Sequence, residues 1–225
     1  MSAPSENARE ESAPAPIYDW TSVMATPVRF VHPARIVSCY DGAISLDIAR
    51  QLQMSDRVQR QLTNLLMDHF DLPDLSEPVE MDQADLGLMA ASAEQISSLV
   101  PLAGAIFWSH IFVAEIRTHE VSEMKRRIGE TAFQFALANR DLAGNLPAPE
   151  NLDGLETAME QDGYRCLASW HDALPQRLGS WARLKHASDR LLVSAPEAGQ
   201  RELGLAIMRR LASNLPELSA QGETQ

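Results

Sequence analysis

An uncharged apolar segment, Ile96–Ala114, is the feature that most constrains how this chain can fold. The segment contains no Asp, Glu, Lys or Arg, and a stretch dense in charge, Glu115–Asp141, follows it immediately with apolar residues at helical spacing. A helix that is apolar on all sides belongs in a core, and an amphipathic helix packs one face against it. The sequence therefore predicts a buried central helix and a second helix packed on it as a core hairpin.

A membrane span is the alternative interpretation of this segment, because its length reaches the lower end of what crosses a bilayer. Pro101, Gly104 and His110 interrupt it, acidic residues flank it, and no cluster of Lys or Arg precedes it. We therefore favour a core helix that is kinked at Pro101 and runs from about Pro101 to Arg117. A second helix is expected over Glu120–Arg140.

Apolar residues recur at helical spacing along nearly the whole chain, and alternating β-branched runs are missing. We predict an all-α fold, a single compact irregular domain of roughly seven to nine helices over residues 17–215. Residues 1–16, rich in Ser, Ala, Pro and Glu, are expected to be a disordered tail, and residues 216–225 a frayed one.

Local signals place several elements in this fold. Val28–Tyr40 is an apolar patch in which Pro33 suits the first turn of a helix, so it is expected to pack on the core as an N-terminal strap. Ser92 with Gln95 three residues later predicts a capping box at the start of a helix. Leu152–Leu174 and Arg201–Leu215 are expected to be helices.

The net charge of −12 and the pI near 4.9 argue against a phosphate-neutralising nucleic-acid surface and against docking on anionic lipid. The two cysteines, Cys39 and Cys166, form no disulfide framework, so a reducing cytosol is the expected compartment. The N-terminal residues have no apolar core typical of a secretory signal. These features suit a protein that meets protein partners.

An acidic stretch, residues 68–85, carries carboxylates without any Lys or Arg. Two prolines interrupt it, and it lacks the ligand pattern of an EF-hand, so a solvated loop is favoured over a cation site. The acidic residues of this stretch are Asp68, Asp71, Asp74, Glu77, Glu80, Asp82 and Asp85.

The sequence shows no catalytic fingerprint: no HExxH, GxSxG, GxGxxG or phosphate-binding loop is present. Cys166 lies on an amphipathic helix and is interpreted as core. No catalytic, cofactor-binding or metal-binding residue is predicted. The alternative is a helical small-ligand-binding protein or enzyme with a pocket around His110, Trp108 and Glu115.

The basic run Lys125–Arg127 lies among glutamates, and Glu123 with Arg127 and Arg126 with Glu130 have the spacing of helical ion pairs. We interpret it as a salt-bridged exposed face rather than as part of a DNA-binding helix-turn-helix. Trp20 and Trp181 are the best candidates for an exposed contact with a partner protein.

The strap with Phe30 and Pro33, and a second stretch that includes Gly104 and Gly129, carry spaced motif positions. In these positions the chain resembles the SctK/YscK proteins of the type III secretion sorting platform. The strap carries the first part of the motif, although Arg35 and Ile36 stand where relatives commonly have aromatic residues. The remainder lies between Leu102 and Ala143. The positions that match the family's motif are Phe30, Pro33, Gly104, Ile106, Ile116, Arg117, Val121, Met124, Ile128, Gly129, Glu130, Phe133, Phe135, Ala136 and Leu137.

The rhizobial NolU proteins belong to the same group, and the chain resembles that branch or its plant-pathogen relatives. The resemblance implies a non-enzymatic cytosolic adaptor at the cytoplasmic face of the inner membrane. Such an adaptor links the cytoplasmic domain of the ring protein SctD to SctQ of the sorting platform. We expect the motif residues to form the fold's core, with Gly129 allowing two helices to approach closely, and the partner surfaces to lie elsewhere.

Overall fold

The computed structural model describes residues 20–75, 79–188 and 198–215, which form twelve α-helices and three 3₁₀ helices. No β-strand occurs in these ranges, which confirms the predicted all-α class. The predicted count of seven to nine helices is too low, because segments read as continuous from their periodicity are broken in the structure. The tails predicted over residues 1–16 and 216–225 lie outside the described residues.

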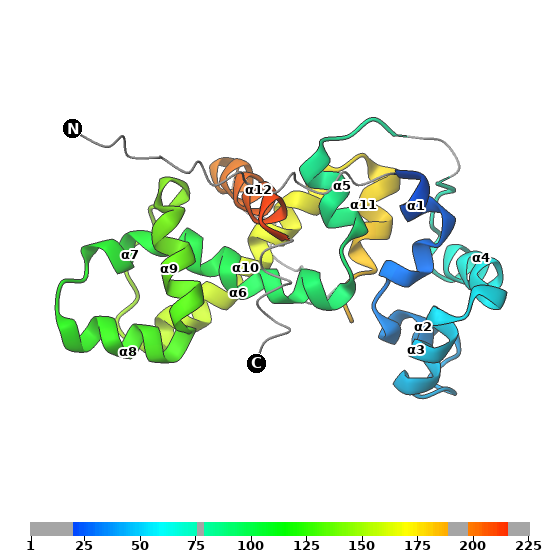
Figure 1. The fold of residues 1–225 in the computed structure, drawn as a ribbon, viewed down its shortest axis with the longest axis horizontal. Helices are drawn as coiled ribbons and strands as arrows, with labels where there is room; N and C mark the ends of the chain where they lie inside the picture. The colour runs from blue at the N-terminus through cyan, green and yellow to red at the C-terminus, as the bar shows by residue number, and fades with distance from the viewer. Residues whose placement is uncertain (1–19, 76–78, 189–197, 216–225) are drawn as a thin grey trace, which may run out of the picture.

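The N-terminal helices gather at one end of an elongated molecule (Figure 1). They are α1 (Trp20–Ala25), η1 (Pro27–Phe30), α2 (Pro33–Cys39), α3 (Leu46–Met54), η2 (Asp56–Val58) and α4 (Gln59–Phe70). The predicted strap is confirmed: Val28 and Ile36 are fully buried, and the backbone N–H of His32 donates to the carbonyl oxygen of Leu184 at 2.8 Å. His32 also caps α2, and Pro33 occupies its first turn, as expected.

Two long helices, α6 (Ala93–Phe107) and α10 (Leu152–Ala173), run side by side through the middle of the molecule and form its axis (Figure 1). The helices of this middle part are α5 (Gln83–Ala90), α6 (Ala93–Phe107), α10 (Leu152–Ala173), α11 (Gln176–Arg183) and α12 (Ala198–Ser213). Helix α6 packs most extensively on α10, and α12 lies across both. The predicted core hairpin forms only in part: α9 (Glu130–Ala138), which follows α6 in the chain, packs on α6 as predicted, but α10 covers more of it.

The opposite end of the molecule contains the segment that follows α6 (Figure 1). It consists of α7 (Ser109–Ala114), α8 (Thr118–Ile128), α9 (Glu130–Ala138) and η3 (Arg140–Leu142). The predicted helix from Pro101 to Arg117 is wrong: α6 begins at Ala93, passes through Pro101 and ends at Phe107. The expected second helix is split at Gly129, whose φ of 88° and ψ of 142° no helix allows. The capping box of Ser92 and Gln95 is confirmed.

The acidic stretch is not wholly an exposed loop. Its last residues belong to α5, where Asp82 accepts a hydrogen bond from the N–H of Ala84 at 2.8 Å. Asp85 is only 5% exposed, and both of its carboxylate oxygens bind the guanidinium of Arg209 in α12, at 3.0 and 2.7 Å. This pair was missed because its members are far apart in sequence.

A buried lysine joins the strap to the middle of the molecule. Lys185 is 2% exposed, and its Nζ donates to the carbonyl oxygen of Ala91 and lies 5.2 Å from the ring centre of Phe30. Burial lowers the pKa of Lys185 to about 7. The strap therefore closes over an amine whose burial disfavours its charged form.

Within the described ranges, no helix combines the length and the apolar character needed to cross a bilayer. The apolar segment that raised this possibility is divided between α6 and α7, and most of its side chains in α6 are buried.

Candidate functional site

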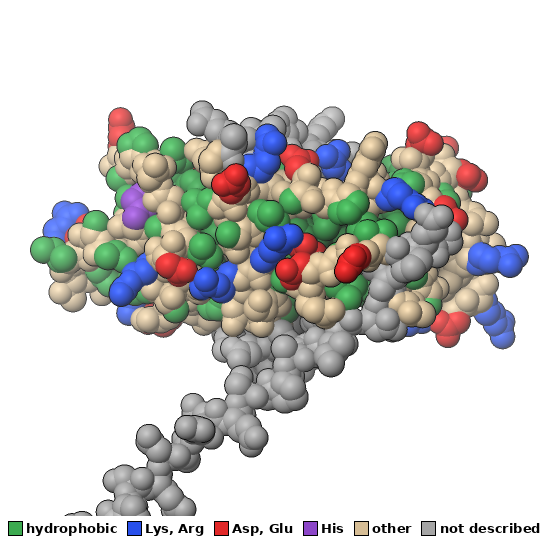
Figure 2. All heavy atoms as spheres, turned by 90° about the horizontal axis from the view of Figure 1, so that it is seen from above, with side chains coloured by type: hydrophobic (Ala, Val, Ile, Leu, Met, Phe, Trp, Pro, Cys, Tyr) green, Lys and Arg blue, Asp and Glu red, His purple; other side chains and the backbone are tan. Residues whose placement is uncertain are grey.

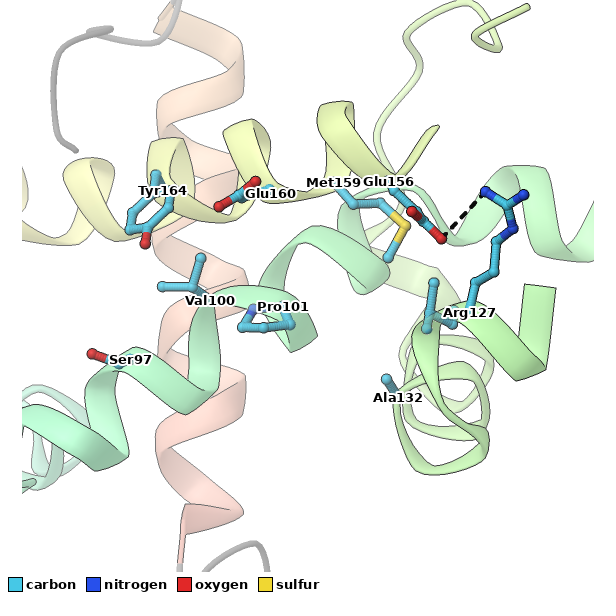
Figure 3. A pocket seen from close by; sticks show the side chains of 10 residues that line it. Ser97, Val100, Pro101, Arg127, Ala132, Glu156, Met159, Glu160 and Tyr164 are labelled. Carbon is cyan, nitrogen blue, oxygen red and sulfur yellow. Dashed lines mark ion pairs between the residues drawn. The ribbon is translucent and has the colours of Figure 1, made fainter. Parts of the chain in front are cut away.

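A hollow with a volume of about 310 Å³ lies where α6, α8, α9 and α10 meet, and we call it the α6–α10 groove (Figure 3). Helices that are distant in sequence form opposite walls. The lining residues are Ser97, Val100, Pro101, Arg127, Ile128, Ala132, Glu156, Met159, Glu160 and Tyr164.

The bottom of the groove is apolar. Val100 and Pro101 come from α6, Ile128 and Ala132 from the α8–α9 junction, and Met159 from α10. Val100 and Met159 belong to the main core, whereas Pro101 is exposed on the wall of the groove. Pro101 has no N–H, which leaves the carbonyl oxygen of Ser97, one turn earlier, without its usual helical donor. The groove thus combines an apolar surface with a local gap in the backbone hydrogen bonding of α6.

One face of α10 supplies the polar rim, with Glu156, Glu160 and Tyr164 at helical spacing. Figure 3 shows Tyr164 pointing from α10 toward Val100 of α6, beside Glu160. Burial, and then the negative charge of Glu160, raise the pKa of Tyr164. The phenol therefore stays protonated and keeps its donor at neutral pH.

Arg127 closes the other end of the groove and is held by three carboxylates. Its Nε donates to Glu123 at 2.8 Å, its Nη1 donates to Asp153, and the same nitrogen lies 3.6 Å from the carboxylate of Glu156 (Figure 3). These contacts raise the pKa of Arg127 further above its already high value. The arginine ties α8 to the first turns of α10 and contributes no uncompensated positive charge to the groove.

The basic run on α8 is salt-bridged, as predicted, and of the two expected pairs that of Glu123 with Arg127 forms. Glu123 receives hydrogen bonds from both Arg126 and Arg127, which lower the pKa of Glu123 to about 2. The predicted pair of Arg126 with Glu130 does not form. Glu130 accepts instead from Lys125 at 2.9 Å, because Gly129 ends α8 and places Glu130 in another helix. Figure 2 shows acidic and basic side chains interspersed with hydrophobic ones on the face that it presents.

The apolar bottom of the groove and the carboxylates on its rim suit it to a ligand that carries an apolar side chain next to a positive charge.

In the described part of the chain, no group of three or more His, Cys, Asp or Glu side chains could hold a metal ion. Cys166 is 2% exposed, and burial raises the pKa of its thiol, which fits the core position expected from the sequence.

The surroundings of His110 differ from those expected of the alternative pocket. Trp108 is 3% exposed and donates from Nε1 to Asp162 of α10 at 2.9 Å. The ring of His110 stacks on Trp108 with 5.5 Å between ring centres, and its Nε2 lies 3.0 Å from the carbonyl oxygen of Leu146. Glu115 is bound by Arg117, whose hydrogen bonds lower the pKa of Glu115 to about 2. Each of the three side chains thus has protein contacts of its own.

The motif residues divide between core and surface. Pro33, Gly104, Ile106, Met124, Phe133 and Ala136 are buried, and Phe30, Val121, Ile128, Phe135 and Leu137 are partly buried. The expectation that all of them build the core is wrong for the remaining four, which are exposed. These are Ile116, at 90% exposure, with Arg117, Gly129 and Glu130.

The close approach expected at Gly129 is also wrong, because a Cβ there would meet no atom within 4 Å. The positive φ at this position is the reason that a glycine occupies it.

The two tryptophans proposed as partner contacts have different outcomes. Trp181 is buried at 4% exposure, and its Nε1 donates to the carbonyl oxygen of Pro73 at 3.0 Å, so it is no exposed contact. Trp20 begins α1, and its side chain lies outside what the structure describes.

Sequence reasoning missed the α6–α10 groove altogether. The spacing of Glu156, Glu160 and Tyr164 could have shown a shared polar face on α10. Nothing in the sequence shows that Pro101 of α6 lies opposite that face.

Comparison with known proteins gives a distant similarity. The chain is 24% identical over 148 residues to nodulation protein NolU of Rhizobium fredii, and equally to nodulation protein NolU of Sinorhizobium fredii strain NBRC 101917 / NGR234. The match covers 64% of this chain and 64% of the length of each relative. No protein-family model matches the chain, and no solved structure does.

Proposed function

We propose that this chain is a non-enzymatic adaptor of a type III protein secretion apparatus, linking the inner-membrane ring protein SctD to SctQ of the cytoplasmic sorting platform. The similarity to nodulation protein NolU over 148 residues carries this proposal, together with the motif that resembles the SctK/YscK family. The remaining support comes from the shape and surface of the molecule.

An adaptor that joins two proteins needs two separate surfaces, and among the described residues the exposed large hydrophobic side chains fall at the two ends of the molecule. Leu46, Ile48 and Met54 of α3 are between 45% and 64% exposed at one end. Val113 of α7 and Ile116, which lies between α7 and α8, are 51% and 90% exposed, and Figure 1 shows these two helices at the other end. We take these two groups of exposed apolar side chains as the candidate contact surfaces of the adaptor.

Ile116 is the most exposed of these residues, and an ion pair fixes its position. Arg117 donates to Glu115 from its backbone N–H at 2.9 Å and from its side chain at 2.9 and 2.7 Å, so the residues on both sides of Ile116 are joined. A backbone segment held in this way loses less conformational freedom on binding. Ile116 is therefore our first choice for a contact residue at this end.

Co-purification of the full chain with the SctD cytoplasmic domain and with SctQ tests the proposal. We expect a complex with each protein and a ternary complex with both. Ile116→Asp should abolish one of the two contacts and Ile48→Asp the other, and the melting temperature of each variant shows whether it is folded. A folded wild-type chain that binds neither protein would refute the adaptor role.

The alternative function, a ligand-binding protein or enzyme with a pocket at His110, has less support. Trp108 is buried and bound to Asp162, and His110 stacks against it, so these side chains contribute to packing at the end of α6.

A further inference from the structure

We propose that the α6–α10 groove is a docking site for an amphipathic, positively charged segment of a partner protein. An aliphatic side chain of that segment would enter the hollow, and a neighbouring Lys or Arg would pair with Glu160. The inference goes beyond the adaptor proposal, because it assigns a binding mode to a surface without naming the partner.

The apolar wall of the groove gives the first argument. Pro101 is exposed on the surface of α6, and Val100, Ile128 and Met159 continue the apolar surface inward. A hollow of about 310 Å³ matches only the smallest cavities that hold complete small ligands. It is suited to one or two side chains of a larger molecule whose remaining surface lies outside, as in helix-in-groove recognition.

The negative charge on the rim of the groove favours a partner segment that carries a positive charge. Arg127 is already held by Glu123, Asp153 and Glu156. Within the described ranges, Glu160 forms neither an ion pair nor a hydrogen bond through its side chain, and it lies beside the apolar wall at the edge of the groove (Figure 3). Its carboxylate can therefore accept a cation without breaking an existing pair, and partial burial by the partner would strengthen that contact.

The same charges disfavour the other classes of occupant. Anionic lipid and nucleic acid would bring phosphate groups close to Glu156 and Glu160, which costs electrostatic energy. A protein segment can place a positive charge and an apolar side chain about one helical turn apart, so one segment can fill the hollow and also meet Glu160.

Fluorescence anisotropy with two labelled helical peptides tests the inference on the full chain. One peptide carries Leu residues four positions apart with Lys residues beside them, and its twin carries Glu in place of each Lys. We expect the Lys peptide to bind at least about tenfold more tightly than the Glu twin. Equal affinities would overturn the proposal and assign the groove to an uncharged apolar ligand. Failure of both peptides to bind would also overturn it.

Two neighbouring serines provide a matched pair of variants. Ser97 lines the groove, whereas Ser98 is exposed outside it, and the hydroxyl of each donates to a backbone carbonyl one turn earlier, at 2.8 and 2.7 Å. Ser97→Trp should fill the groove and abolish binding, and Ser98→Trp should leave it unchanged. Equal binding by the two variants would place the peptide elsewhere.

A charge reversal keeps the test decisive if Ser97→Trp fails to fold. Glu160→Lys changes an exposed side chain, so the core stays intact, and it should reverse the preference in favour of the Glu peptide. Glu202→Lys, at an exposed position on α12, is the control and should leave the preference unchanged. A preference for the Lys peptide that survives Glu160→Lys would exclude Glu160 as its partner. Failure of the peptide test would leave the adaptor proposal standing, because co-purification examines that role separately.

Discussion

Gly104 of α6 lies directly against the backbone of Met159 in α10: a Cβ on Gly104 would stand 2.0 Å from the carbonyl oxygen of Met159. The contact is reciprocal, because a Cβ on Gly163 of α10 would stand 2.2 Å from the carbonyl oxygen of Val100 in α6. Each helix thus presents a glycine to the backbone of the other. On each helix, the residue whose carbonyl oxygen meets the partner's glycine lies four positions before the helix's own glycine. This crossing brings Val100 and Met159 together at the bottom of the α6–α10 groove.

We predict that Gly104→Ala and Gly163→Ala each destabilise the fold by about 1–3 kcal/mol, the usual cost of overpacking. The methyl group would meet a backbone carbonyl that a rotamer change cannot move, so the two helices must separate. Urea unfolding followed by circular dichroism measures the effect. Gly199→Ala in α12 is the control, since a Cβ there meets nothing within 4 Å and alanine favours a helix. Equal midpoints for Gly104→Ala and Gly199→Ala would show that the crossing tolerates a methyl group.

Gly129 is expected to resist substitution for a different reason. At φ 88° and ψ 142° every residue with a Cβ is strained, by about 1–3 kcal/mol, although the space around it is open. Gly129→Ala and Gly129→Leu should therefore lower the free energy of unfolding by similar amounts. A much larger loss for Leu than for Ala would indicate crowding in place of backbone strain.

Lys185 should make stability depend on pH between about 7 and its ordinary pKa. Its folded-state pKa of about 7 lies below the ordinary value of 10.5, so in this interval the unfolded chain binds a proton that the folded chain does not. The free energy of unfolding therefore rises with pH across the interval, by at most about 1.4 kcal/mol per unit, and this contribution is lost as pH falls through 10.5 toward 7.

Urea titrations at pH 7 and pH 9 should show this rise in the wild type and a smaller one in Lys185→Met. The buried His171 lies near this cluster and forms a ring contact with His186, but burial lowers the pKa of His171 well below 6.5, so it stays neutral in this interval. The same rise in both proteins would show that Lys185 keeps its proton in the folded state.

The pair of Asp85 with Arg209 should contribute more to stability than a neighbouring exposed pair. Asp85→Ala is expected to cost about 1–2 kcal/mol, discounted because the side chain of Arg209 is 40% exposed. Asp141→Ala, which removes the exposed pair with Arg210, should cost less than about 0.5 kcal/mol. Thermal melts of both variants compare the two pairs, and Arg209→Ala with the double variant Asp85→Ala/Arg209→Ala completes the double-mutant cycle that measures the coupling of the buried pair. Equal losses for the two Asp variants would show that burial adds nothing to this pair.

Local signals in the sequence predicted local structure. The all-α class followed from apolar spacing, the start of α6 from Ser92 with Gln95, and the start of α2 from Pro33. Each of these depends on residues within one or two turns of the chain. Helix ends were less predictable: α6 stops at Phe107 although apolar residues continue, because the chain changes direction there to build the far end of the molecule.

By itself, the sequence determined that this chain is helical, acidic and built on the apolar segment that begins at Ile96. Only the tertiary structure decided that α10 covers that segment, that Trp181 is buried and Ile116 exposed, and that Glu160 faces an apolar hollow. The physical reason is that hydrophobic burial is not directional. Periodicity shows that a face must be covered, but the partner is chosen by close contacts such as that of Gly104 with Met159, whose members meet only in the folded chain.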